Sequence, residues 1–234
     1  MSELFPMTRP SAVADLLSGD AARRERTLGI IVRAYWRPVY KYLRLRYRRA
    51  AEEAEDLTQA FFEVAIQRAT LSSYDPERAR FRTFLRACLD RHVIDHHRRA
   101  TAQRRGGTYQ HLDFTAAEAE LSASPGRDPE QAFDAEWLRH LMQLALEGLD
   151  AALAARDKPI HARLFRDFHL DDPPTYAEAA ARYNITTTDV TNWLHVARRE
   201  FRRVALSLLR DLTVDDDDFA AEARAVFGLD VATD

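Results

Sequence analysis

Arginine side chains recur along one side of the stretch FRTFLRACLDRHVIDHHRR, residues 81–99. At about 100° per residue of a helix, Arg80, Arg91 and Arg98 fall on the same side, and Arg82 and Arg86 lie on its flank. Guanidinium groups bind phosphates, and aromatic rings can stack on bases. The spacing therefore predicts a surface for a polyanion. A solvated arginine face on an ordinary helical domain is the alternative.

The opposite side of the same stretch has the spacing of a core-facing stripe, with apolar or aromatic residues at i, i+3, i+4 and i+7. Its two phenylalanines suit either the core or a contact with bases. Cys88, His92 and His96 have a spacing that zinc ligands can use. They lie on the core-facing arc and lack a fourth ligand, so packing is favoured over metal binding. The stripe consists of Phe81, Phe84, Leu85, Cys88, Leu89 and His92.

A second group of polar and basic residues lies in TYAEAAARYNITTTDVTNWLHVARREFRR, which has the layout of a helix-turn-helix. Asn184 suits the left-handed backbone of the turn, and Thr186 or Thr187 can cap the second helix. Amide, hydroxyl and guanidinium groups on the outward side of that helix are the types that read bases and phosphates. A corner of two helices also occurs as plain scaffolding. The outward residues are Thr191, Asn192, His195, Arg199 and Arg202.

The composition of the whole chain favours the helices that must position these residues. The 234 residues include only 7 glycines, and 46% are hydrophobic. We expect an all-α protein of two small helical domains joined by a flexible linker, the second containing the helix-turn-helix. The single cysteine, Cys88, excludes an internal disulfide and is typical of a cytoplasmic protein. The absence of a membrane-length apolar run and of a signal pattern at the N-terminus supports the same expectation.

Changes in composition divide the chain into five segments. Residues 1–20 form an N-terminal extension, and residues 21–105 form a first helical domain. Residues 106–134 mix Gly, Ser, Pro and acids and are expected to form a linker. Residues 135–210 form the second helical domain, and residues 211–234 form an acidic tail with one short helix. Because the charges are segregated along the chain, a net charge of −3 is compatible with local nucleic-acid binding.

Three ordered motifs resemble the extracytoplasmic-function group of sigma-70 family factors. AEDLTQAFFEVA is similar to the region-two motif that docks on the clamp of RNA polymerase. RFRTFLRACLDRHVIDHHRR is similar to the stretch that melts and recognises the −10 element, and YAEAAARYNITTTDVTNWLHVARREFRR to region four. The resemblance covers residues 21–210. It implies a non-catalytic initiation subunit without cofactor or metal, which binds the clamp and flap of core polymerase and melts the promoter DNA of a dedicated set of genes.

The resemblance also assigns roles to individual residues. Asp56, Leu57, Gln59 and Phe62 stand where the family binds the polymerase. The outward residues of the helix-turn-helix stand where the family reads the −35 element. The loop before the basic helix is where the family captures a −10 base. The residues that the resemblance implies in −10 binding are Tyr74, Arg80, Arg82, Phe84, Arg91, Arg98 and Arg99.

Two other classes of protein fit part of this pattern. One is a helix-turn-helix regulator that binds DNA without core polymerase, and the other is a sigma-like adaptor that no longer initiates transcription. An enzyme is disfavoured, because the sequence contains no nucleotide-binding loop, nucleophile–base signature or obvious pair of carboxylates. Control is open between an anti-sigma factor, phosphorylation of Thr58 by a Ser/Thr kinase, as the resemblance implies for some subgroups, and screening of a basic face by the acidic tail from Asp211 onward.

Overall fold

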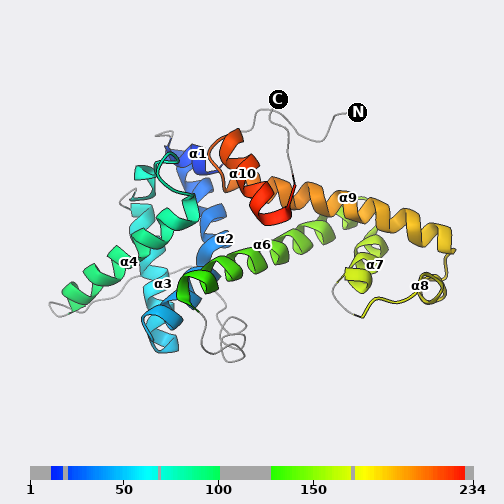
Figure 1. Cartoon of the computed structure of the whole chain (residues 1–234), viewed down its shortest axis with the longest axis horizontal. Helices are drawn as coiled ribbons and strands as arrows, with labels where there is room; N and C mark the ends of the chain where they lie inside the picture. The colour runs from blue at the N-terminus through cyan, green and yellow to red at the C-terminus, as the bar shows by residue number, and fades with distance from the viewer. Residues whose placement is uncertain (1–11, 18–20, 68–69, 101–127, 170–171, 230–234) are drawn as a thin grey trace. The chain divides into compact units, whose positions relative to one another are not determined.

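The computed structural model describes residues 12–17, 21–67, 70–100, 128–169 and 172–229 (Figure 1). These residues form helices joined by turns, and no strand occurs among them. The predicted all-α class is therefore confirmed. Within these segments no helix is both long and apolar enough to cross a membrane. Of the described residues, 12–140 and 209–229 form a larger compact unit, and 141–208 form a smaller one.

The larger unit is built first from the helices that carry the basic stretch. These are α1 (Ala12–Leu17), α2 (Ala21–Arg46), α3 (Ala51–Gln67), the short 3-10 helix η1 (Thr70–Ser73) and α4 (Phe81–Ala100). Pro38 lies inside α2 without ending it, because the packing of buried neighbours such as Tyr35 and Tyr40 outweighs the missing hydrogen bond. The largest core side chains of these helices include Tyr35, Tyr40, Tyr42, Leu43, Leu57, Leu85 and Leu89.

The first half of α6 (Pro129–Ala154) also belongs to the larger unit. The Trp137 ring stacks on the Tyr35 ring with centroids 6.3 Å apart. The buried Glu136 carboxylate lies 2.7 Å from Lys41 Nζ and 3.5 Å from Arg37 Nε. Residues 129–134 are thus helical where the sequence predicts a linker, because contacts of this helix with α2 determine their structure. Residues 106–127 of the expected linker lie outside the described residues.

The segment after α9 completes the larger unit with α10 (Asp216–Phe227), in the region where the sequence predicts one short helix. The Asp215 side chain caps α10 by accepting a hydrogen bond from the Asp218 N–H. Gly228 ends the helix at φ +64°, a conformation that glycine adopts without strain. Phe219, Glu222 and Ala223 are buried. The expected acidic tail therefore includes a packed helix.

The smaller unit contains the second half of α6, α7 (Pro159–His169), α8 (Tyr176–Tyr183) and most of α9 (Thr187–Asp211). Leu149 and Leu153 of α6 pack with Ala162, Phe165 and Ala197 in one cluster. A second cluster joins the three later helices and consists of Leu164, Ala179, Val190 and Leu194.

The turn between α8 and α9 is defined by reciprocal hydrogen bonds at both helix starts. Thr175 and Glu178 form a capping box at α8, each side chain accepting from the other residue's backbone N–H. Thr186 and Asp189 repeat this arrangement at α9. Asn184 ends α8 in the left-handed conformation, at φ 52° and ψ 51°. The predictions that Asn184 makes the turn and that Thr186 caps the second helix are confirmed.

Candidate nucleic-acid interfaces

The basic stripe of α4 is exposed toward the end of the helix and covered at its start. Arg91 and Arg98 are exposed, and the Arg80 side chain is 44% exposed. The Arg82 and Arg86 side chains retain only 13% and 14% of their accessible surface. The side chain of Arg99 lies outside the described residues. The predicted polyanion surface is therefore interrupted: its arginines near the middle and end of α4 are exposed, whereas Arg82 and Arg86 are largely covered.

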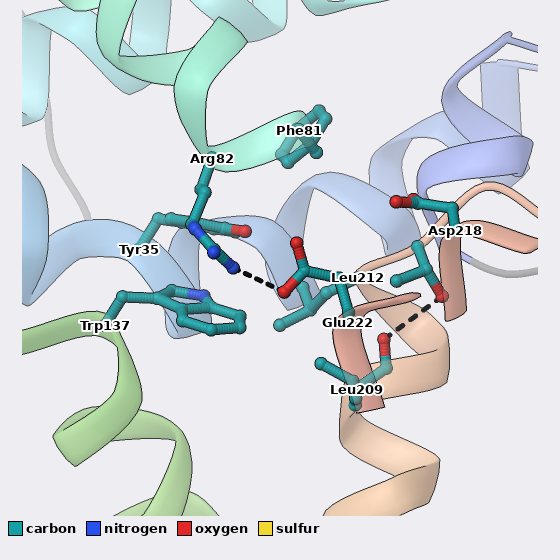
Figure 2. Close-up of a pocket in the computed structure, with 9 residues that line it drawn as sticks. Tyr35, Phe81, Arg82, Trp137, Leu209, Leu212, Asp218 and Glu222 are labelled. Atoms are coloured by element: carbon teal, nitrogen blue, oxygen red, sulfur yellow. Dashed lines mark hydrogen bonds and ion pairs between the residues drawn. The ribbon is translucent and has the colours of Figure 1, made fainter. Parts of the chain in front are cut away.

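Arg80 and Arg82 both contact Glu222 of α10. Arg82 Nη1 lies 2.5 Å from Glu222 Oε2, and Arg80 Nε lies 3.3 Å from Glu222 Oε1. Arg82 Nε is also 3.3 Å from Asp134, and its guanidinium carbon lies 4.9 Å from the centre of the Trp137 ring. Figure 2 shows the Arg82 guanidinium between this ring and the Glu222 carboxylate. Two of the residues implied in −10 binding are thus neutralised within the chain.

Arg86 has a similar environment one turn further along α4. Its Nη2 lies 2.7 Å from Glu130 Oε2, and its guanidinium carbon is 6.0 Å from the centre of the Phe133 ring. Both partners belong to the first turns of α6. Acidic and aromatic side chains of α6 therefore cover this flank of α4.

Tyr74, implied in −10 binding, is buried in the loop before α4. Its ring meets the rings of Phe81 and Phe84 at centroid distances of 5.1 and 5.3 Å. Its hydroxyl has no hydrogen-bond partner among the described residues. Burial, with a smaller contribution from Asp218, raises the pKa of Tyr74 far above its ordinary value. Phe84 is half-buried, so neither ring is fully presented to solvent.

The apolar side of α4 packs in the core as its spacing predicts. Phe81, Leu85, Cys88 and Leu89 are buried, and burial raises the pKa of the Cys88 thiol. His92 is half-buried, with its ring edge-on to Phe61 at 5.7 Å. Among the residues that the structure describes, no group of three or more His, Cys, Asp or Glu side chains is arranged for a metal ion.

The residues implied in polymerase binding differ in their exposure on α3. Asp56 is exposed and Gln59 is half-buried, whereas Leu57 and Phe62 belong to the core. Leu57 and Phe62 therefore pack α3 against the core. Asp56, and in part Gln59, remain accessible to solvent. Thr58 is fully buried, and its hydroxyl donates a 2.7 Å hydrogen bond to the Ala54 carbonyl. Phosphorylation of this hydroxyl would therefore require local opening of the helix.

The second predicted interface lies along α9. The residues that the sequence assigns to its outward side are all exposed, whereas Val190, Leu194 and Ala197 on its other side are buried. Trp193 is not on this exposed side, because its ring stacks on His161 of α7 with centroids 4.6 Å apart. The exposed row consists of Thr191, Asn192, His195, Arg199 and Arg202.

Comparison with known protein families identifies part of this arrangement. Residues 31–103 match Sigma-70 region 2. The matched segment contains α3, α4 and most of α2. It therefore includes both the AEDLTQAFFEVA motif of α3 and the basic stripe of α4. Neither the curated proteins nor the solved structures gave a match to this chain. Residues 31–103 are therefore similar to a sigma-70 region 2 domain, and this similarity supports a role in binding core RNA polymerase and in promoter melting.

Sequence reasoning did not find the acidic partners of region 2. Glu222 lies between the buried residues Phe219 and Ala223, a helical spacing that placed it on a packed face. Glu136 likewise precedes Trp137 on a buried arc. Glu136 also pairs with its neighbour Arg139, but Lys41 lies 95 positions from Glu136 and Arg82 lies 140 positions from Glu222, so no local pattern indicated these two contacts.

Region 2 also contains a polar contact between α2 and α4 that the sequence did not indicate. Tyr47 Oη donates a 2.7 Å hydrogen bond to Asp90, and Tyr42 Oη lies 3.4 Å from the same carboxylate. Burial and the Asp90 charge raise the pKa of Tyr42 to about 12. Asp90 therefore links the middle of α4 to Tyr42 and Tyr47 at the end of α2.

Proposed function

We propose that this chain is a sigma factor of the extracytoplasmic-function type, which directs core RNA polymerase to a dedicated set of promoters. The observation that carries the proposal is the region 2 match over residues 31–103, because it joins the motif of α3 and the basic helix α4 in one domain. Asp56 is exposed and Gln59 is half-buried on α3, so both are open to contact with a polymerase surface.

Region 2 is proposed to hold the −10 strand along α4. Arg91 and Arg98 are exposed on the helix and suit phosphate groups. Phe84, and Tyr74 once the loop before α4 opens, suit an unstacked base, because aromatic rings stack on bases regardless of sequence. Removing a base from the duplex costs a few kcal/mol, so the binding surface has to recover that energy through such contacts.

The smaller unit is proposed to read the −35 element through a helix-turn-helix. The short turn at Asn184 and the capped start of α9 support this role, because a rigid corner fixes the second helix for entry into the major groove. Asn192 and His195 can contact base edges, and Arg199 can contact bases or phosphates. The same unit is proposed to dock on the polymerase flap.

The deciding experiment is reconstitution with core polymerase on promoter templates selected by the holoenzyme. We expect the full chain to support initiation on duplex promoters and on templates with a melted −10 bubble. Asp56→Ala is expected to weaken binding to core polymerase, and Asn192→Ala to weaken promoter selection alone. Asp217→Asn, an exposed change on α10, is the control for altered charge.

The outcomes distinguish this proposal from the other two classes. Tight duplex binding without initiation contradicts the sigma proposal and indicates a helix-turn-helix regulator. Binding to polymerase without DNA binding or initiation indicates an adaptor. Initiation that is unaffected by Asp56→Ala and Asn192→Ala contradicts the roles given to α3 and α9.

A further inference from the structure

The Glu222 carboxylate forms ion pairs with the two guanidinium groups at the start of α4. Only 6% of its side-chain surface is exposed, and its two oxygens lie 3.3 Å from Arg80 and 2.5 Å from Arg82. Each oxygen thus has its own arginine, and Figure 2 shows the contact with Arg82. A phosphate offers the same charge and acceptor geometry to guanidinium groups. A nucleic-acid backbone and Glu222 therefore compete for the same N–H groups.

The rest of α10 fastens this carboxylate beside the start of α4. Phe219 and Ala223 are buried on either side of Glu222, and Leu209 and Leu212 of the preceding segment are buried as well. Glu222 and Asp218 line one pocket together with Phe81 and Arg82 (Figure 2). Arg210 forms an ion pair with Asp216 and lies over the Phe219 ring, which fixes the first turn of α10. The contact is thus built by a whole element.

This covered arrangement also carries costs that opening removes. Asp218 is half-buried, and burial raises the pKa of its carboxyl. A buried ion pair loses much of its Coulomb energy to desolvation. The closed state is therefore one that a competing ligand can displace.

We propose that α10 is an intramolecular competitor of DNA, which covers Arg80 and Arg82 of region 2 until a nucleic-acid backbone displaces Glu222. Displacement exchanges one carboxylate for phosphates and frees the guanidinium groups of Arg80 and Arg82 for the bound strand. The inference rests on the proposed function only in requiring that region 2 binds promoter DNA.

The test compares two neutralising variants of the full chain. Glu222→Gln and Asp217→Asn each remove one negative charge from α10, but only Glu222 contacts Arg80 and Arg82. Binding is measured by fluorescence anisotropy with a labelled single-stranded DNA oligonucleotide. We expect Glu222→Gln to tighten binding roughly threefold to tenfold, the size of one ordinary hydrogen bond, because the glutamine amide oxygen can still accept from one arginine. Asp217→Asn is expected to change it much less. Equal effects of the two variants overturn the inference.

Hydrogen exchange on the unaltered protein gives an independent test. We expect amides within residues 218–227 to exchange faster when the oligonucleotide is added, because α10 leaves its site. DNA binding with unchanged exchange in α10 contradicts the inference and leaves the proposed function standing. Failure of every variant to bind DNA, both alone and with core polymerase, contradicts the proposed function and the inference together.

Discussion

Buried glutamates of this protein each meet more than one basic side chain. Glu136 meets Lys41 and Arg37, and Glu222 meets Arg80 and Arg82. Glu200 of the smaller unit meets Arg156 and Arg203, and the hydrogen bond from Arg203 holds the pKa of its carboxyl below the ordinary value. Burial of a charge is tolerated only with such partners. These residues therefore set which helices can pack together.

Removing Glu136 should expose this dependence, because Lys41 and Arg37 would remain buried without their carboxylate. We expect Glu136→Ala to lower the free energy of unfolding by about 3–5 kcal/mol. Urea unfolding followed by circular dichroism measures the change. The control is Glu130→Ala, which removes an ion pair whose Glu130 side chain is 61% exposed and should cost less than about 1 kcal/mol. Equal losses in the two variants would contradict the structural role of Glu136.

At the scale of elements, the corner between α8 and α9 depends on its two capping arrangements. Hydrogen bonds from Thr175 hold the pKa of Glu178 below its ordinary value, and those from Thr186 do the same for Asp189. Such a carboxylate stabilises the fold above its ordinary pKa, and the contribution is lost as pH falls through the lowered pKa. The corner should therefore loosen in acid before the buried core does.

Thr186→Ala tests this link between capping and acidity. The variant removes the hydroxyl that contributes most to the lowered pKa of Asp189, so we expect that pKa to rise toward its ordinary value. NMR titration of the Asp189 carboxyl measures the shift. Thr188→Ala, at an exposed position in the same turn, should leave the Asp189 pKa unchanged. A pKa of Asp189 that stays low in Thr186→Ala would contradict the capping role of the hydroxyl.

The close approach of α6 and α9 in the smaller unit depends on Gly148. A Cβ at this position would lie 2.6 Å from Val204 Cγ1, which is closer than a Cβ approaches a non-bonded atom in protein structures. We expect Gly148→Ala to destabilise the protein by about 1–3 kcal/mol, because the added methyl group overpacks the contact. Thermal unfolding measures the change.

Two further variants separate this overpacking from the helix propensity of alanine. Adding Val204→Ala to Gly148→Ala should recover part of the loss, since it removes the clashing methyl groups. Gly29→Ala places the same methyl group in open space on α2 and should stabilise by about 1 kcal/mol or less. A stabilising Gly148→Ala would show that the helices can move apart at no cost.

At the scale of the whole molecule, the positive charge that is open to a ligand depends on which arginines form ion pairs as well as on where they lie in the sequence. The acidic side chains of α6 and α10 neutralise arginines of α2 and of the start of α4, whereas Arg91 is exposed near the middle of α4. The formal net charge of −3 describes neither the paired arginines nor the exposed ones. DNA binding should therefore depend on a few exposed cations.

Arg91→Ala should weaken binding of single-stranded DNA and lower its dependence on salt. Loss of one phosphate contact reduces the slope of log K against log salt by about 0.7. Titrations at several salt concentrations measure this slope. Arg163→Ala removes an exposed arginine from α7 and serves as the control outside region 2. An unchanged slope in Arg91→Ala would show that Arg91 makes no phosphate contact.

The sequence predicted the helical class, the core side of α4 and the turn at Asn184, because each of these follows from spacing or local backbone preference. It misplaced the start of α6, since Gly, Ser and Pro nearby suggested a linker while the buried contacts of Glu136 and Trp137 lie with distant α2. The sequence also predicted Arg82 as a DNA contact but did not indicate its ion pair with Glu222. Glu222 is 140 positions away, and such pairing is decided only by tertiary packing.

That separation has a consequence for the order in which the protein is made. During synthesis, α4 leaves the ribosome long before Glu222 is added, so Arg80 and Arg82 are without this partner while most of the chain is translated. Closing so long a loop is slow compared with forming local helices. The newly made protein therefore passes through a stage in which its basic helix is uncovered, at the ribosome, where RNA is abundant.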